Sequence, residues 1–383
     1  MEEKSEGNLR EIASVFFKLG CIAFGGPAAH IALMETEIVS QRKWLSRQRF
    51  LDLMGATNLI PGPNSTELTM HCGYERGGWK GLIVAGICFI FPAVAITGVL
   101  AWCYTSYGQV PAVKPFIQGI TPAVLVVILE AILKLGKKAL KTKWLYFIAF
   151  LVLICSLLGV NEIYALLAAG VLAGAFFASR SRNKSLKNLL LLALPLSATQ
   201  NELVLSQGKI FLSFLKVGAI LYGSGYVLFA YLDAELVVPG YLSRPDLLEA
   251  IAVGQFTPGP VLSTATFIGW QLGGWQGALA ATAGIFLPSF LFVLLLNPLV
   301  DRMRKSTFLS GFLDGVNAAA VAVMAGVVIK MGKDVFFPLG DFEWTAGLIF
   351  IAALILNYTW KRSNALIIVL FGSLMGFLLH HFV

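Results

Sequence analysis

Long apolar segments, separated by short polar loops, run along almost the whole chain. A helix needs about 20 residues to cross roughly 30 Å of hydrocarbon at 1.5 Å per residue, and segments of that length recur throughout. The pattern therefore predicts an all-α polytopic membrane protein with about ten transmembrane helices. The predicted spans cover residues 12–34, 79–105, 116–135, 144–160, 162–179, 209–231, 275–299, 311–331, 344–358 and 364–382.

Two further apolar segments, residues 50–74 and 247–270, each contain the tripeptide Pro-Gly-Pro. Proline removes a backbone donor and clashes with the preceding turn, so the tripeptide ends one helix, and its second proline can begin the next. We predict a helix break at membrane depth at Pro61-Gly62-Pro63 and at Pro258-Gly259-Pro260. For the loops to lie on consistent sides of the membrane, each of these segments must return to the side from which it entered. Each break therefore forms the tip of a re-entrant hairpin.

The similarity between the two segments extends to their surroundings. Phe16-Phe17-Lys18-Leu19-Gly20 matches Phe214-Leu215-Lys216-Val217-Gly218, and Gly77-Gly78-Trp79 matches Gly273-Gly274-Trp275, at a nearly constant offset. Such a register predicts two homologous halves related by a pseudo-two-fold axis. We assign residues 1–179 and 209–383 to the two transporter-like repeats, and residues 180–208 to a cytoplasmic or interfacial linker.

The basic residues in the loops predict that the second half is inverted. Loops 36–50 and 136–143 carry four lysines and arginines each, whereas loop 106–115 has only Lys114. The corresponding loops of the second half reverse this pattern, because loop 232–247 has only Arg244 and loop 300–306 is basic. Since cytoplasmic loops collect Lys and Arg, equivalent loops face opposite sides. We expect both termini outside and the linker inside.

Composition supports the membrane setting and excludes several classes of function. Hydrophobic residues make up 57% of the chain and charged residues only 13%. The net charge is +8, but the basic residues that produce it lie in short loops between the apolar segments, so we expect no nucleic-acid partner. The five cysteines lack metal-ligand spacing, so we expect no metal and no cofactor. Gly223-Ser224-Gly225 is a faint protease signal without a nearby histidine base, and we predict that the protein is not an enzyme.

Broken helices in inverted repeats are typical of secondary transporters with a site near the bilayer midplane. The free N–H groups and partial positive charge at the start of a half-helix favour an anion. The sequence therefore predicts an anion site built from the breaks and their flanking donors. The candidate substrate-binding residues are Lys18, Phe24, Gly25, Gly26, Pro27, Asn58, Pro61, Gly62, Pro63, Asn64, Ser65, Thr66, Lys216, Tyr222, Gly223, Ser224, Gly225, Gln255, Pro258, Gly259, Pro260, Ser263 and Thr264.

The charged candidates each have two interpretations. Lys18 and Lys216 either face the anion, or serve structural ion pairs and reach the headgroups with their long side chains. Glu67 and Glu130 fall within apolar segments and are candidates for proton coupling, the alternative being hydrogen bonds to helix breaks or lysines. His30 is an isolated polar residue of the kind that usually makes a structural contact.

Several of these motifs, in the same order, resemble the chromate ion transporter family in its long two-domain form. They are Phe24-Gly25-Gly26-Pro27-Ala28-Ala29-His30, Trp44-Leu45-Ser46, Pro61-Gly62-Pro63 with Ser65-Thr66, and Gly254-Gln255-Phe256-Thr257-Pro258-Gly259-Pro260. The resemblance implies proton-driven export of chromate across the inner membrane, with sulfate as an analogue. Transport of sulfate or another oxyanion, or an anion channel, is the alternative. Expected partners are a small oxyanion, membrane lipid and a second copy in a homodimer.

Overall fold

The computed structural model describes residues 9–23, 27–57, 60–108, 110, 113–160, 162–180, 206–222, 225, 227–296, 306–338, 340–360 and 365–382. Within these ranges the chain forms helices and no strands, as an all-α membrane protein does. The first half contains α1 (Leu9–Ile22), α2 (Pro27–Met34), the π-helix η1 (Glu35–Gln41), α3 (Arg47–Thr57), α4 (Asn64–Tyr107), α5 (Lys114–Ala139), α6 (Lys143–Leu157) and α7 (Glu162–Arg180).

The second half presents a similar order of elements. It contains α8 (Gln207–Ile220), α9 (Leu228–Leu232), the π-helix η2 (Asp233–Val237), α10 (Arg244–Phe256), the 3-10 helix η3 (Val261–Ser263), α11 (Thr264–Leu296), α13 (Thr307–Phe336), α14 (Trp344–Thr359) and α15 (Ala365–Phe382). Both halves therefore have a π-helical segment at the same place, directly after the short second helix.

Four described segments are long and apolar enough to cross a membrane, namely Asn64–Tyr107, Lys114–Ala139, Val261–Leu295 and Phe308–Phe336. Shorter apolar helices cover Lys143–Leu157, Tyr164–Ser179, Trp344–Thr359 and Ala365–His381. The predicted continuous spans 12–34 and 209–231 are wrong, because α1 ends at Ile22 and α8 ends at Ile220, before α2 and α9 begin. Proline at the start of α2 and glycines before α9 disfavour continuation of the preceding helix.

The long helix α4 contains a sharp reversal that the sequence reading missed. Gly77 and Gly78 leave helical geometry, and Gly78 has φ 61° and ψ −154°, a conformation open to glycine. Past this point, a Cβ added at Gly73 would lie 2.4 Å from the carbonyl oxygen of Gly81. Eight residues along a straight helix would separate these positions by about 12 Å. Residues 64–76 and 79–107 are therefore two antiparallel helices in close backbone contact.

The same reversal occurs in α11. Gly274 has φ 61° and ψ −152°, and a Cβ at Gly269 would lie 2.3 Å from the Gly277 carbonyl oxygen. The hydroxyls of Thr266 and Thr282 are 2.8 Å apart across the reversal. The two Gly-Gly pairs are thus tight turns that fold the helix after each Pro-Gly-Pro back toward the preceding elements.

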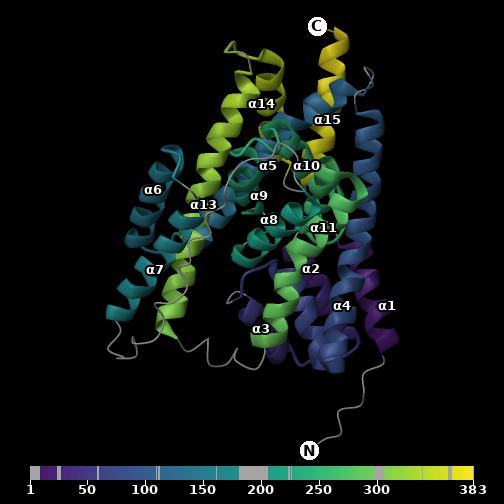
Figure 1. The fold of residues 1–383 in the computed structure, drawn as a ribbon, viewed down its shortest axis with the longest axis vertical. Coiled ribbons are helices and arrows are strands. Elements are labelled where there is room, and N and C mark those ends of the chain that lie inside the picture. Colours follow the sequence, from purple (N-terminus) through teal and green to yellow (C-terminus); the bar gives the residue numbers. More distant parts are fainter. Residues whose placement is uncertain are drawn as a thin grey trace, which may run out of the picture.

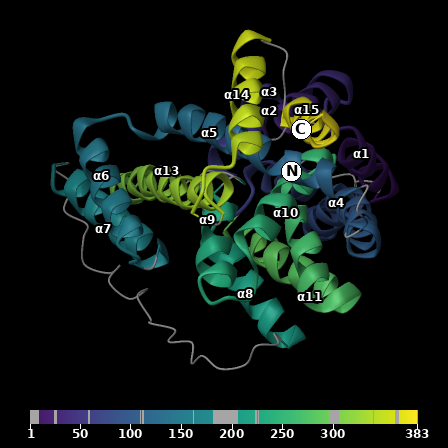
Figure 2. The same ribbon diagram turned by 90° about the horizontal axis from the view of Figure 1, so that it is seen from above.

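The helices at the end of each half pack against the long helix of the other half. Figures 1 and 2 show α6 and α7 beside α13, and α14 and α15 beside α5. Small residues allow this close approach, since a Cβ at Gly119 on α5 would lie 2.2 Å from the carbonyl oxygen of Gly372 on α15. The two halves are consequently interleaved.

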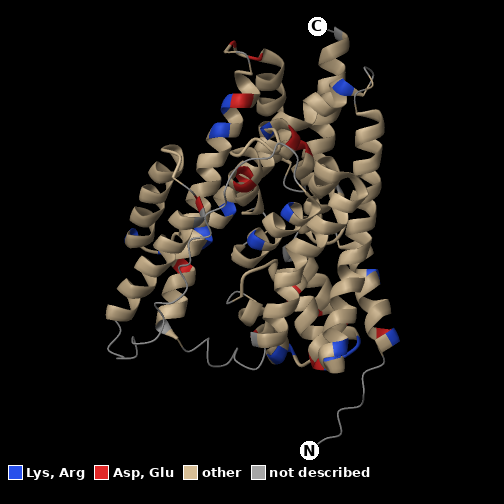
Figure 3. Cartoon of the chain, in the orientation of Figure 1, with Lys and Arg blue, Asp and Glu red and all other residues tan. Residues whose placement is uncertain are grey.

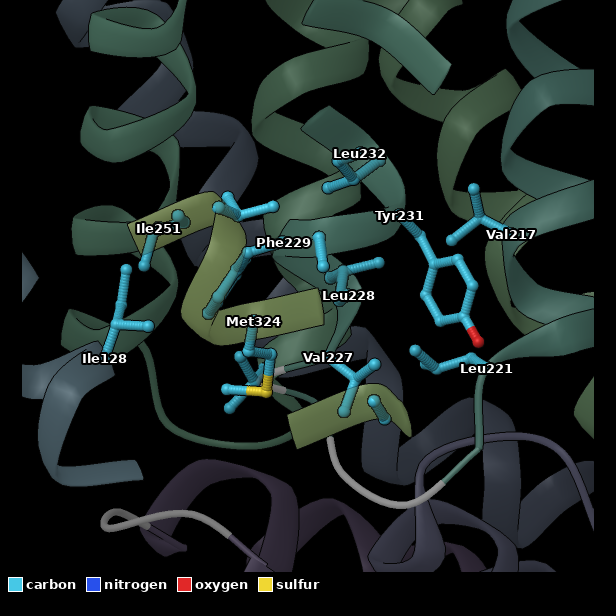
Figure 4. Packing of buried hydrophobic residues seen from close by; sticks show 14 of the residues in the cluster. Ile128, Val217, Leu221, Val227, Leu228, Phe229, Tyr231, Leu232, Ile251 and Met324 are labelled. Atoms are coloured by element: carbon cyan, nitrogen blue, oxygen red, sulfur yellow. The ribbon is translucent and has the colours of Figure 1, made fainter. Parts of the chain in front are cut away.

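The short helix α9 lies inside the larger apolar core. Its residues Leu228, Phe229 and Leu232 pack near Ile128 of α5 and Met324 of α13 (Figure 4). Elsewhere, charged residues form small groups separated by long uncharged stretches of helix (Figure 3). The described residues of the break after α3, Ile60 to Pro63, are buried as well, which is the setting in which irregular backbone is tolerated at membrane depth.

Candidate functional site

The first break is a buried loop between α3 and α4. Helix α3 ends at Thr57, and Pro63 takes an extended conformation (φ −79°, ψ 103°) as the N-cap of α4. Gly62 has φ 141°, which a residue with a side chain rarely adopts. The Gly62 N–H donates to the carbonyl oxygen of Leu221, at 2.5 Å, directly after α8 of the other half.

The second break makes the reciprocal contact. Gly259 has φ 86°, and its N–H donates to the carbonyl oxygen of Ala23 at 2.9 Å, directly after α1. Ala23 and Leu221 hold equivalent places in the two halves, so each break donates the same backbone hydrogen bond to the residue that follows the first helix of the other half. The glycine N–H groups that we expected to face an anion already have acceptors in this conformation.

A small cavity lies between the two loops. His30, Pro63, Ser65, Gly225, Pro260, Val261 and Leu262 line it. The structure thus brings together the predicted residues Pro63, Ser65, Gly225 and Pro260. About 10 Å³ is open to the centre of a water molecule, which is space for roughly one water and too little for a tetrahedral oxyanion. The conformation is therefore closed around its centre.

His30 links the end of α1 to the start of α4 beside this cavity. Its Nε2 lies 3.0 Å from the carbonyl oxygen of Ala23, and its Nδ1 lies 3.1 Å from the hydroxyl oxygen of Ser65. A carbonyl can only accept, so Nε2 carries the proton, and in the neutral ring Nδ1 accepts from Ser65. The Ala23 carbonyl therefore accepts from both His30 and Gly259. The sequence suggested a structural contact for His30 but gave no sign that it lines the centre.

Glu67 lies one turn into α4 and is fully buried. Its carboxyl lies against Gly62, because a Cβ added there would be 2.1 Å from Glu67 Oε1 and 2.5 Å from Ser289 Oγ. Neither carboxyl oxygen has a hydrogen bond of normal geometry among the described residues. Burying a charged carboxylate without a partner is costly, so this environment favours the neutral acid.

Lys18 and Lys216 are both paired with glutamates. Lys18 Nζ lies 3.0 Å from Glu37 Oε2, and Lys216 Nζ lies 2.6 Å from Glu235 Oε2. The pairs are equivalent and join the first helix of each half to its π-helix. Neither lysine lines the cavity, which agrees with the structural-pairing alternative. The signal for Glu37 and Glu235 was their common offset with the lysines, which the sequence reading did not use.

The Lys18 ammonium also sets the charge state of its partner. Its hydrogen bond lowers the pKa of Glu37, Arg42 contributes in the same direction from 2.9 Å, and burial opposes both. Glu130 is different, since it pairs with Lys134 one helical turn later and does not line the cavity. A further buried carboxylate, Glu162, lies 3.5 Å from Lys330 and was not singled out from the sequence.

The remaining candidates lie around the loops or outside the described residues. Ser263 Oγ accepts from Thr97 across the halves at 3.2 Å, and Thr264 Oγ1 donates to the Val261 carbonyl at 2.7 Å. Pro27 is the first residue of α2, and Gln255 lies in the last turn of α10. Tyr222 is half-buried, and Pro61, Thr66 and Pro258 are buried. Asn64 lines a second cavity. Phe24, Gly25, Gly26, Asn58, Gly223 and Ser224 lie outside the described residues.

Comparison with known sequences identifies the family. The sequence model of the chromate transporter family matches residues 10–175 and 208–377, which together make up most of the chain. The chain belongs to the chromate transporter family. The two matched blocks each contain one Pro-Gly-Pro break and one Gly-Gly reversal of this family member.

Individual relatives are similar over almost their whole length. The chain is 29% identical to a probable chromate transport protein of Synechococcus elongatus over 381 residues, covering 96% of this chain and 95% of the relative. It is 29% identical to the chromate transport protein of Pseudomonas aeruginosa, covering 95% and 90%, respectively. The chromate transport protein of Cupriavidus metallidurans is 30% identical, covering 97% and 94%. No solved structure gives a significant match.

Proposed function

We propose that this protein is a secondary transporter that exports chromate across the inner membrane by alternating access, with proton coupling. Membership of the chromate transporter family, and its similarity to the chromate transport proteins of Pseudomonas aeruginosa and Cupriavidus metallidurans, support the substrate. The observation that carries the mechanism is the reciprocal pair of hydrogen bonds, Gly62 to Leu221 and Gly259 to Ala23, around one shared cavity. Such a centre belongs equally to both halves, as alternating access requires.

The arrangement of the loops supports an inverted repeat with two re-entrant hairpins. Helices α2 and α3 lie in the lower half of Figure 1, whereas their counterparts lie higher, α9 near mid-height and α10 in the upper part. The Gly-Gly reversals return the chain after each break, so each loop is the tip of a hairpin. In this proposal the linker 180–208 is cytoplasmic, the carboxyl terminus is outside, and homodimers form in the lipid bilayer. The start of α1 lies beside the basic loop 36–50, since Glu11 pairs with Arg42 at 2.8 Å, so we place the amino terminus on the cytoplasmic side and not outside as the sequence predicted.

Opening of the centre would create the anion site. When the tips move away from the ends of α8 and α1, the N–H groups of Gly62 and Gly259 lose Leu221 and Ala23 as acceptors. An oxyanion entering between the tips replaces those carbonyls and gains the hydroxyl of Ser65 and the ring of His30 as further donors. The start of α4 adds its partial positive charge. Substrate and carbonyls thus compete for the same donors, which links binding to opening.

Glu67 supplies the proton in this proposal. Its carboxyl lies beside Gly62, so a negative charge there would repel an arriving dianion. The protonated form is therefore compatible with a bound oxyanion, and the ionised form requires water at the opened tip. Proton coupling follows because the centre that holds the anion also holds the proton on Glu67. Glu130, which pairs with Lys134 away from the cavity, has no part in it.

Flux measurements in proteoliposomes test this function. We expect saturable chromate flux that an imposed pH gradient accelerates, and loss of that acceleration with retained flux in Glu67→Gln. Ser65→Ala should raise the KM several-fold, whereas the control Ser179→Ala should not, because Ser179 only donates to the Phe176 carbonyl on α7. Chromate flux that is indifferent to the gradient would refute proton coupling. Saturable sulfate flux without chromate flux would assign the other oxyanion, and non-saturable flux would indicate a channel.

A further inference from the structure

A second, larger cavity lies between α5 and α13. About 160 Å³ of it is open to the centre of a water molecule, many times the space between the tips. Residues of both halves contribute to its wall. Those that matter for its chemistry and position are Asn64, Lys138, Lys141, Val227, Asp314 and Asn317.

This cavity adjoins the closed centre. Asn64 lines the larger cavity, and the two residues on either side of it along the chain, Pro63 and Ser65, line the smaller one. On the opposite side, Val227 lines the larger cavity and Gly225, two residues before it, lines the smaller one. The start of α4, with Gly225 and Val227 opposite, therefore lies between the two spaces.

The charges in the larger cavity are unequal. Lys141 Nζ lies 2.9 Å from Asp314 Oδ1, so this lysine and this carboxylate compensate each other. Lys138 also lines the cavity, and no described carboxylate lies within ion-pair distance of it. The side-chain amide of Asn317 adds polar groups on α13. The cavity consequently carries an uncompensated positive charge, with neutral hydrogen-bonding amides at its wall.

The position of Lys138 suggests from which side of the membrane the substrate enters the cavity. It lies at the end of α5, in the basic loop 136–143, and such loops are typical of the cytoplasmic side. An exporter collects its substrate on that side, and a positive charge in a partly enclosed space raises the local concentration of a dianion.

We propose that this cavity is a vestibule in which a tetrahedral oxyanion dianion binds Lys138 and the amides of Asn317 and Asn64 before it passes Pro63 into the centre. The proposal rests on the proposed function for the identity of the ligand. The Lys141–Asp314 pair links the loop after α5 to α13 and leaves Lys138 as the cation that receives the substrate.

Transport kinetics test the vestibule with a matched pair of variants. Lys138→Gln and Lys137→Gln remove the same charge from adjacent exposed positions, but Lys137 does not line the cavity. With chromate on the side of loop 136–143, Lys138→Gln should raise the KM about three- to tenfold with little change in kcat, and Lys137→Gln should change it less than twofold. Raised salt should shrink the difference. Equal KM values for the two variants would overturn the vestibule.

A second measurement does not depend on transport. In a variant without native cysteines, Asn317→Cys is labelled with a negatively and a positively charged thiol reagent, and the ratio of the two rates reports the local potential. Lys138→Gln should lower the anion-to-cation ratio several-fold, whereas Lys137→Gln should leave it nearly unchanged. An unchanged ratio would refute the positive vestibule. A lowered ratio in a protein that moves no oxyanion would refute the proposed function and retain the vestibule. The replaced cysteines are Cys21, Cys72, Cys88, Cys103 and Cys155.

Discussion

Replacing Gly62 by alanine tests the geometry of the first tip. The backbone there has φ 141°, and an added Cβ would lie 2.1 Å from Glu67 Oε1 and 2.5 Å from Ser289 Oγ. The unfavourable φ costs about 1–2 kcal/mol, and overpacking of a filled site costs about 1–3 kcal/mol more. We therefore expect Gly62→Ala to reduce the free energy of unfolding by about 2–5 kcal/mol.

Gly240→Ala is a control that separates the cost of the backbone conformation from the cost of crowding. Gly240 has φ 85°, and an added Cβ meets no atom within 4 Å, so this variant carries only the backbone strain of about 1–2 kcal/mol. Thermal unfolding of the purified protein in detergent measures both, at roughly 2 °C per kcal/mol. A midpoint for Gly62→Ala that falls no further than that of Gly240→Ala would refute the crowding at the tip.

The crowding can be assigned to Glu67 with a double-mutant cycle. Glu67→Ala removes the nearest atom to the new methyl group, so the two substitutions together should cost less than the sum of their separate effects. The expected coupling is about 1–2 kcal/mol in the relieving direction. Strictly additive losses would mean that Glu67 does not limit the space at Gly62.

Three further outcomes follow from other contacts. Lys18 and Arg42 lower the pKa of Glu37, so the pair with Lys18 should stabilise the protein at neutral pH and lose that contribution as the pH falls through the lowered pKa. In Glu37→Gln the unfolding temperature should therefore fall less steeply with decreasing pH than in the unsubstituted protein. Gly81→Ala places a methyl 2.2 Å from the Gly73 carbonyl oxygen and should sharply reduce folded yield in size-exclusion chromatography, whereas Gly98→Ala, which meets nothing, should not. Thr142→Ala removes the N-cap of α6 and should cost about 1 kcal/mol in the same unfolding assay.

Local chemistry was readable from the sequence. Proline and glycine determine backbone conformation within a few residues, so the break at Pro61-Gly62-Pro63 could be predicted without any knowledge of the fold. The Gly77-Gly78 pair was noted as a repeat, but its meaning as a turn depends on the contact between Gly73 and Gly81. A helix with a Gly-Gly pair and one that reverses there look alike in sequence.

Long-range partners were not readable. The acceptor of the Gly62 N–H is Leu221, in the other half of the chain, and no local pattern indicates it. For Lys18 the equal spacing of the two Lys–Glu pairs was a signal, but the contact with Glu37 itself depends on the end of α1 at Ile22 and the new start of the helix at Pro27. An apolar pattern reports burial along one segment, whereas the centre of this protein is defined by contacts between segments.

The hydrogen bonds that link each tip to the first helix of the other half also impose an order on biosynthesis. The first tip leaves the ribosome long before Leu221, the acceptor for its Gly62 N–H, has been made. An unsatisfied backbone donor in hydrocarbon costs several kcal/mol, so the newly inserted first half holds its tip in a different, hydrated or displaced conformation. Maturation is completed only when α8 arrives, and a fragment ending at residue 179 would insert but not close.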